Sequence, residues 1–349
     1  MPANSSAPKI TLVWRSDAHL ADVAPQARID DWAAAILDKT AQVGEIARKV
    51  GAVAVLDGGD FFHVKSPSRN SHELVRRAAE IHAKYPCPVY ACPGNHDVKY
   101  GSLEYLAEAP LSVLYETGVF HRLYDEHEAV FEAGDFIGMQ GEQMVNGSSG
   151  FRNKLSVRVV GIPYHGVLYD MNRFSTILKG SEDWLVAVVH CLASPSGGTI
   201  YESEDVLKYA DLSNLAPDIW LLGHSHVNQG VQKVGGKWLI NIGSFSRGAL
   251  NQDDLSRQPS VAVLDFDAAG IKVDVVPLKV RPAAEVFDLE GRIRVESRKM
   301  SMDALVDSIQ VTLVSRPEGS LLDTVRALPG VPDLVRERSL AYLEAAGGK

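Results

Sequence analysis

The chain has 349 residues, of which 46% are hydrophobic and 23% are charged, and its formal net charge is −9. This composition is typical of a globular protein and excludes a disordered or fibrous chain. The negative net charge gives no general attraction to nucleic acid, although it leaves room for a local basic patch. Three cysteines, Cys87, Cys92 and Cys191, form no C-x-x-C pair, which favours a reducing compartment.

The N-terminal segment MPANSSAPK lacks the apolar core of a signal peptide. The longest apolar runs, such as WLVAVV at 184–189, are far shorter than the ~20 residues that a membrane span requires. We therefore expect a soluble, cytoplasmic protein with no membrane partner.

Short apolar segments along the chain predict buried strands, and polar residues follow each of them. The segments are 9–14, followed by SDAHL; 52–56, followed by GGDFFH; 89–91, followed by CPGNHD; 184–189, followed by His190; and 219–222, followed by GHSH. Amphipathic helices are predicted over 30–50 and 70–84. Strands that alternate with helices indicate an α/β fold, in which ligands bind beyond the carboxyl ends of the strands. We therefore expect the polar loops to meet at one place.

The later part of the chain has a different pattern. Residues 231–242 predict a hairpin that turns at Gly235-Gly236, and segments 260–267 and 271–278 predict another near Ala269-Gly270. These hairpins extend a second, more antiparallel sheet, and 281–285 is interpreted as a junction. We therefore predict a catalytic domain over 1–282 and a small α+β unit over 283–349. The further elements predicted here are a strand at 291–298, helices at 301–309 and 332–346, and a flexible loop at 146–150.

The loops carry carboxylate, imidazole and amide side chains, which together suit Mn, Fe or Zn. These residues are Asp17, His19, Asp60, His63, Asn95, His96, Asp97, His190, His224 and His226. Asp17/His19 and His224/His226 are each two residues apart, so in extended backbone their side chains point to the same side, about 6.6 Å apart at Cα. Each motif alone is also typical of an ordinary turn, but their joint occurrence behind buried strands predicts a metal site.

These motifs resemble those of the calcineurin-like metallophosphoesterase superfamily. They are DAH at 17–19, GD at 59–60, GNHD at 94–97, the lone His190, and GHSH at 223–226. The resemblance covers residues 10–245 and implies a sandwich of two mixed β-sheets flanked by helices. Within the superfamily, GDFFHVKSPS at 59–68 is most similar to the SbcD nuclease subunits of double-strand-break repair.

The resemblance implies two divalent ions, with Mn²⁺ expected first and Fe or Zn as alternatives. Asp17, His19 and His226 would hold one ion. Asn95, His190 and His224 would hold the other, and Asp60 would bridge the two. His96 would protonate the leaving oxygen or stabilise the pentavalent phosphorus, and Asp97 would orient His96. His63 would contact the phosphate or assist the leaving group, or else be a loop histidine packed beside Phe61 or Phe62.

Two enzymatic functions follow from the resemblance. The first is a DNA nuclease in which the ions activate a water that attacks phosphorus in line. Its expected partners are an SbcC-type ABC ATPase, docked on or capped by 283–349, and a second copy contacting the helices near 70–117. Its expected phosphate contacts are Lys65, Arg69, Arg152, Lys154, Arg173 and Arg247. The alternative is a stand-alone phosphoesterase acting on nucleotides, cyclic nucleotides or phosphoproteins. The complete ligand set argues against a non-enzymatic scaffold.

Overall fold

The computed structural model describes residues 8–63, 70–136, 151–198, 204–289 and 333–345, together with residues 291, 322, 325 and 326. The chain divides into two compact units, Met1–Phe287 and Asp288–Lys349. The predicted domain boundary after residue 282 stays a prediction. The predicted loop at 146–150 and helix at 301–309 lie outside the described residues, as does the strand at 291–298 except for Gly291.

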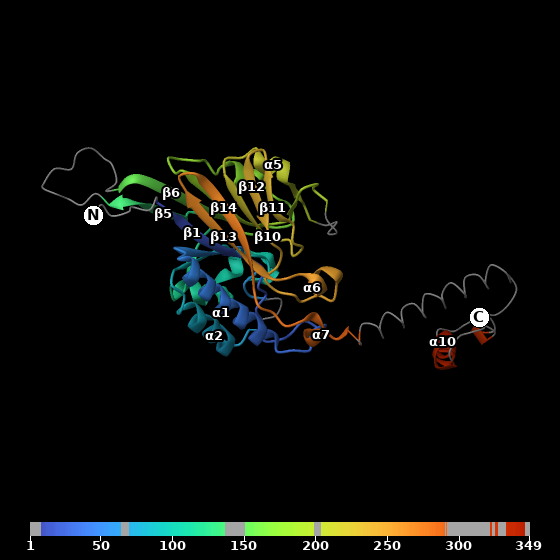
Figure 1. Cartoon of the computed structure of the whole chain (residues 1–349). Helices are drawn as coiled ribbons and strands as arrows, with labels where there is room; N and C mark the ends of the chain where they lie inside the picture. Colours follow the sequence, from blue (N-terminus) through green and yellow to red (C-terminus); the bar gives the residue numbers. More distant parts are fainter. Residues whose placement is uncertain are drawn as a thin grey trace. The chain divides into compact units, whose positions relative to one another are not determined.

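Two mixed six-stranded sheets form the centre of the first unit (Figure 1). The first sheet contains β1 (Ile10–Arg15), β2 (Ala54–Asp57), β3 (Val89–Ala91), β4 (Phe120–Arg122), β13 (Ser260–Asp267) and β14 (Gly270–Pro277). The second contains β5 (Ala129–Phe136), β6 (Phe151–Ile162), β7 (Trp184–Cys191), β10 (Ile219–His224), β11 (Gly230–Val234) and β12 (Lys237–Asn241). The strand orders are β14-β13-β1-β2-β3-β4 and β11-β12-β10-β7-β6-β5. A short pair, β8 (Ala193–Ser194) and β9 (Leu207–Lys208), is separate.

Both sheets have parallel strands at their centre and antiparallel strands at their edges. In the first sheet, β1, β2, β3 and β4 are parallel, while β13 pairs antiparallel with β1 and β14. In the second, β6, β7, β10 and β12 are parallel, while β5 and β11 are antiparallel. The two hairpins that the sequence predicted are present in the structure as the antiparallel pairs β11–β12 and β13–β14.

The sheets pack face to face because alternate side chains of each strand point to opposite faces. In β10, Ile219 and Leu221 join the core between the sheets, whereas Trp220 and Leu222 join the core on the outer face. In β1, Leu12 and Trp14 likewise face the other sheet. Burial on both faces explains why the central strands read as continuous apolar runs.

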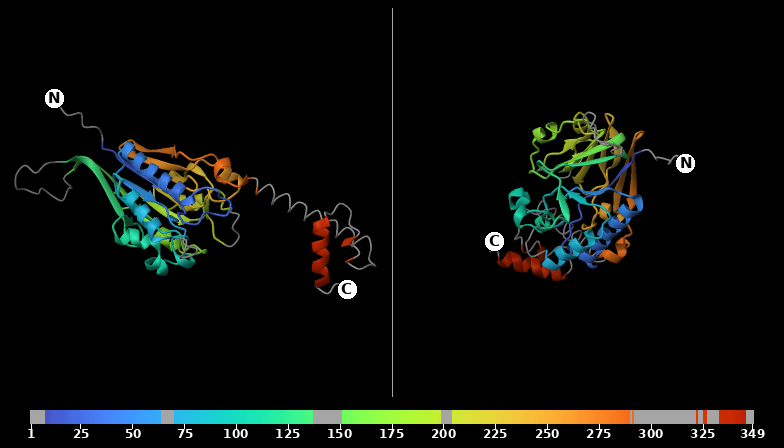
Figure 2. Two further views of the ribbon diagram at one scale, coloured as in Figure 1. Left: turned by 90° about the horizontal axis from the view of Figure 1, so that it is seen from below. Right: turned by 90° about the vertical axis from the view of Figure 1, so that its left-hand side faces the viewer.

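Helices cover the outer faces of the sandwich, as the views in Figures 1 and 2 show for α1, α2 and α5. The helices of the first unit are α1 (Trp32–Val50), α2 (His72–His82), α3 (Pro110–Glu116), α4 (Met171–Ser175), α5 (Tyr209–Ser213), α6 (Gln252–Ser256) and α7 (Ala283–Val286). The short 3₁₀ helices in the described residues of this unit are η2 (Lys99–Gly101) and η3 (Leu103–Glu108). In the second unit, α10 (Asp333–Ala345) agrees with the helix predicted over 332–346. No helix in the described part of the chain is long and apolar enough to cross a membrane.

The sequence prediction of an α/β sandwich of two mixed sheets flanked by helices is confirmed. The predicted junction at 281–285 contains the short helix α7. Strands β4, β5 and β6 were not predicted. The unpredicted β5 and β6 complete one edge of the second sheet.

Candidate metal centre

The loops that follow the parallel strands meet at one end of the two sheets. Asp17 and His19 follow β1, Asp60 follows β2, His190 lies in β7, and His224 ends β10. The first two loops run side by side, because Asp17 N donates to Gly59 O at 2.9 Å and His19 N donates to Asp60 O at 2.8 Å. The predicted convergence of the loops is therefore seen in the backbone itself.

Four residues of the predicted ligand set have left-handed backbone conformations. The φ angles are 59° at Asp17, 50° at His19, 55° at Asp60 and 75° at His224. This conformation is uncommon for residues other than glycine, and its occurrence is concentrated at functional sites. Here it turns the chain sharply after each strand, so that side chains from separate loops face one another.

Two glycines permit the close approach of these loops. A Cβ atom on Gly94 would lie 2.2 Å from Asp60 Oδ1. A Cβ atom on Gly59, whose φ is 98°, would lie 2.6 Å from His190 Nδ1. The glycines of the GGD and GNHD motifs are therefore required by the packing of the site.

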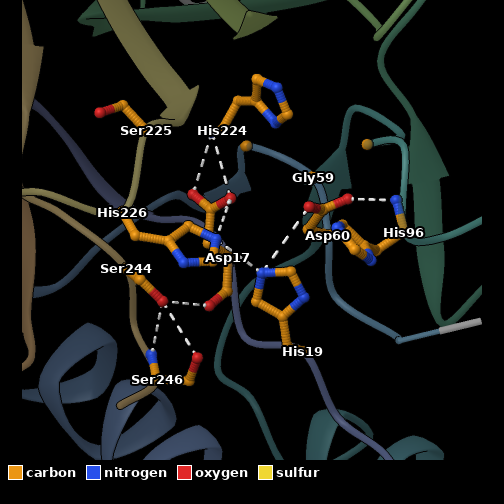
Figure 3. Close-up of polar contacts among 12 residues, drawn as sticks. Asp17, His19, Gly59, Asp60, His96, His224, Ser225, His226, Ser244 and Ser246 are labelled. Atoms are coloured by element: carbon orange, nitrogen blue, oxygen red, sulfur yellow. Dashed lines mark hydrogen bonds and ion pairs between the residues drawn. The ribbon is translucent and has the colours of Figure 1, made fainter. Parts of the chain in front are cut away.

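The first donor cluster consists of Asp17, His19 and His226 (Figure 3). Their ligand atoms all lie within 4.8 Å of one another. His19 Nε2 lies 2.9 Å from His226 Nε2, and His226 Nε2 lies 3.8 Å from Asp17 Oδ1. Two ligands bound to one ion at ~2.1 Å are about 3 to 4.2 Å apart, depending on the angle between the bonds, so these separations suit a shared divalent ion. Burial lowers the pKa of His19 well below its usual value, which keeps its ring neutral, as a ligand must be.

The second donor cluster consists of Asp60, His190 and His224, whose ligand atoms also lie within 4.8 Å of one another. Asn95 adds an amide oxygen, because its Oδ1 lies 3.2 Å from His190 Nε2. Burial lowers the pKa of His190, but the Asp60 and Asp17 carboxylates raise it to about 10, so an ion that binds there displaces a proton. These two groups have the members that the resemblance implied, and a third group of possible donors, His19, His63 and His96, shares His19 with the first. The assignment of ligands to each ion stays a prediction.

Asp60 lies between the two clusters. Its Oδ2 is 3.4 Å from His190 Nε2 and 3.7 Å from His19 Nε2. Burial would raise the pKa of Asp60, but His190 and His19 hold it well below its usual value. Asp60 is fully buried, and among the described residues Oδ2 accepts no hydrogen bond. The neighbouring imidazoles stabilise this buried, ionised oxygen, and a metal ion on either side would take over that role.

Hydrogen bonds fix the orientation of two ligand imidazoles. His190 Nδ1 lies 2.7 Å from Gly58 O, which leaves Nε2 directed at Asp60. His224 Nε2 lies 3.0 Å from Glu204 Oε1, which leaves Nδ1 as the nitrogen available to an ion. In metal-binding histidines, the ring nitrogen that does not bind the ion usually has a hydrogen-bond partner of this kind. Glu204 was not predicted, because no motif or spacing in the sequence connects it to the ligand set.

His63 and His96 lie together beside the first cluster. Their rings stack with centroids 4.6 Å apart, and His63 Nδ1 lies 3.4 Å from His19 Nδ1. The alternative in which His63 packs beside Phe61 or Phe62 as an ordinary loop residue does not describe this arrangement. His96 also donates its backbone N–H to Asp60 Oδ1 at 2.7 Å. Both histidines line the cavity described below, where a substrate would meet them.

Asp97 has a structural contact that the sequence did not indicate. Its buried carboxylate accepts hydrogen bonds from Phe62 N at 2.8 Å and Gly94 N at 2.9 Å. These bonds join the loop after β2 to the loop after β3. The predicted orientation of His96 by Asp97 stays a prediction.

A buried ion pair supports the loop after β2. Arg15 Nε donates to Asp57 Oδ2 at 2.7 Å, and Asp57 Oδ1 accepts from Gly59 N at 3.1 Å. Both side chains are almost completely buried. The pair connects the ends of β1 and β2 directly beneath the predicted ligands.

A cavity of about 640 Å³ opens beside the first cluster. Its described lining includes His19, His63, His96 and His226, and apolar side chains such as Trp32 and Leu192. Lysine and arginine are absent from that described lining. Substrate can therefore reach the first donor cluster and the two stacked histidines from one side.

One of the basic residues predicted to contact DNA is placed elsewhere. Arg247 is buried, with only 7% of its surface exposed, and its Nη2 donates to Arg281 O at 2.6 Å, so the prediction for this residue is wrong. Arg173 is exposed, and Lys154 pairs with Glu132. Lys65 and Arg69 lie outside the described residues, as does the side chain of Arg152.

Comparison with known proteins agrees with this site. The family of calcineurin-like phosphoesterases matches residues 15–228, which contain every predicted ligand. The chain belongs to this family. With its two donor clusters, it is a metal-dependent phosphoester hydrolase with a dimetal centre.

Solved structures of low sequence identity are also similar. The calcineurin-like phosphoesterase YfkN from Bacillus subtilis is 12% identical, covering 79% of this chain and 94% of that chain, with a TM-score of 0.45. A dimetal phosphatase from Danio rerio is 11% identical, covering 77% of this chain and 96% of that chain, with a TM-score of 0.46. No curated protein matches the sequence significantly.

Proposed function

We propose that the chain is a two-metal phosphodiesterase. The observation that carries this proposal is the position of Asp60, whose unsatisfied Oδ2 lies between two groups of nitrogen and oxygen donors. When bound, the ions would activate a water and neutralise charge on the phosphate oxygens. Asp17, His19 and His226 would hold one ion, with Asn95, His190 and His224 at the other and Asp60 shared.

The stacked histidines support a substrate with a poor leaving group. A sugar hydroxyl leaves as a strongly basic alkoxide unless an acid protonates it, whereas an aryl oxide leaves without help. His96 would transfer a proton to the leaving oxygen, and His63, stacked 4.6 Å from it, would contact the phosphate or assist this transfer. A cyclic nucleotide has the same kind of leaving group, so the choice between the two substrates rests on the similarity of residues 59–68 to the SbcD subunits. On that ground we propose DNA as the substrate, in the manner of an SbcD-like exo- or endonuclease.

A second candidate substrate is a small phosphodiester, such as a cyclic nucleotide. The cavity favours this alternative, because its described lining offers apolar side chains and no lysine or arginine to bind a DNA backbone. The nuclease proposal places the backbone contacts on residues such as Lys65 and Arg69. An SbcC-type ATPase, a second copy of the chain and a docking role for 283–349 are proposals that depend on the nuclease function.

Three substrates and one variant test these proposals. The purified chain with Mn²⁺ is incubated with duplex DNA, single-stranded DNA and an aryl phosphodiester. We expect DNA cleavage. A His63 that assists proton transfer predicts that His63→Ala reduces DNA cleavage by roughly 10² to 10⁴ while aryl diester turnover falls less than about tenfold, whereas a His63 that contacts the phosphate predicts an equal fall in both. Intact DNA with rapid turnover of the small diester would favour the second candidate. Both candidate functions require that a chelator abolish the DNA and diester activities and that added Mn²⁺ restore them.

A further inference from the structure

A second cavity, of about 540 Å³, lies between α1 and the segment 279–282 that precedes α7. The described linings of this cavity and of the cavity at the metal centre share no residue. The cationic residues in its described lining are Arg28, Lys39, Arg247, Lys279 and Arg281. The carboxylates in its described lining belong to Asp31 and Asp38, which are both exposed.

Two of these cations are buried without a carboxylate partner. Lys39 is 5% exposed, and its Nζ donates to Ala35 O at 2.9 Å and lies 5.9 Å above the ring of Phe245. Arg247 is 7% exposed, and its guanidinium donates to Arg281 O. Among the described residues, neither cation has an ion pair with a carboxylate.

The remaining buried cations of the described chain are all paired. Arg15 bonds to Asp57 at 2.7 Å, and Arg28 bonds to both carboxylate oxygens of Asp30 at 2.7 Å each. Arg257 forms ion pairs with Asp253 and Asp254. Burying a charge without a partner is strongly unfavourable. The two buried cations without a carboxylate partner, Lys39 and Arg247, line the same cavity.

We propose that this cavity binds a phosphate dianion, as inorganic phosphate or as the phosphomonoester of a small molecule. With Lys39 protonated, the two unpaired cations carry a charge of +2 together, which a dianion neutralises and a single carboxylate does not. Each has N–H donors that remain available, because a guanidinium has five and an ammonium has three. Charge-assisted hydrogen bonds from such donors are the usual means of holding phosphate.

The surroundings of the cavity support the same ligand. Lys279 and Arg281 are exposed at its edge, where they would attract an anion. Asp31 accepts a hydrogen bond from Ala34 N and Asp38 accepts one from Gln42, so both carboxylates bind groups of their own helix. Burial, followed by the charges of Arg28 and Arg247, lowers the pKa of Lys39 to about 7. A bound dianion would return the ammonium to its charged form.

Titration calorimetry of the full chain tests the proposal, with a chelator present and the ionic strength constant. The probes are inorganic phosphate, glycerol 3-phosphate and acetate. We expect both phosphates to bind and acetate not to bind. Lys39→Met and Arg247→Met should each weaken binding roughly tenfold or more, since each removes a charged donor. Lys49→Met, which changes an exposed lysine of the same helix, should leave binding unchanged.

Three possible results of the titrations either identify the ligand or overturn the proposal. Binding of inorganic phosphate but not of glycerol 3-phosphate would identify the free ion as the ligand. Equal binding by the wild type, Lys39→Met and Arg247→Met would overturn the proposal, because the anion would then bind elsewhere. Failure of both phosphates to bind the wild type would also overturn it. Arg247→Lys retains the charge and should bind more tightly than Arg247→Met, which separates loss of charge from loss of fold.

Discussion

Replacing Lys39 by methionine should stabilise the protein, because the change removes a buried charge and retains most of the side-chain volume. Burial, together with the charges of Arg28 and Arg247, lowers the pKa of Lys39 from 10.5 to about 7. A pKa difference of this size corresponds to about 5 kcal/mol. Between these two pH values the unfolded chain binds more protons than the folded chain, so wild-type stability rises with pH. The advantage of Lys39→Met should therefore be largest below pH 7 and decline towards pH 10.5.

Urea unfolding at pH 6.5 and pH 9, in a buffer without phosphate, measures this effect. Lys39→Met should gain up to about 5 kcal/mol at the lower pH and only about 2 kcal/mol at the higher pH. Lys49→Met, at an exposed position of α1, is the matched control and should change little at either pH. A Lys39→Met protein that is less stable than the wild type at pH 6.5, or whose advantage does not depend on pH, would refute the reasoning.

Three further variants test the metal centre and its support. His96→Ser should abolish turnover and leave bound metal, measured by elemental analysis, nearly unchanged; loss of the metal as well would make His96 a ligand. Glu204→Gln should reduce metal affinity or activity about 10- to 100-fold, because Glu204 orients the ring of His224, and unchanged metal titrations would exclude that role. Asp57→Asn should lower the free energy of unfolding by about 3 to 5 kcal/mol, since it leaves Arg15 buried without its partner, and an unchanged denaturation midpoint would contradict this.

The sequence was sufficient to predict the strands that carry the site. Segments such as 219–222 are buried on both faces, so they appear as apolar runs whose ends are easy to identify. Strand β5 was not predicted, because AVFEAGDF contains Glu, Gly and Asp, and because the exposed position 130 carries an apolar residue, Val130, which hides the regular alternation of burial from the sequence. Edge strands have one free side and need less apolar sequence than central ones.

The ligands were easier to predict than the residues that support them. Asp17 and His224 stand in motifs at strand ends, whereas Glu204 reaches His224 only through the folded loop. Lys39 gives no signal either, because from the sequence a lysine at that position of an amphipathic helix is indistinguishable from an ordinary surface residue. Its burial depends on Phe245 and Arg247, which are more than two hundred positions away in the chain.

The paired backbones of the loops after β1 and β2 have a consequence for how the enzyme acquires its ions. Asp17 and His19 are positioned by main-chain hydrogen bonds to Gly59 and Asp60, and these bonds use none of the side-chain donor atoms of the site. A polypeptide that relies on such bonds would complete its folding first and take up metal afterwards. Which element it contains in the cell would then reflect the supply of each ion at that later moment.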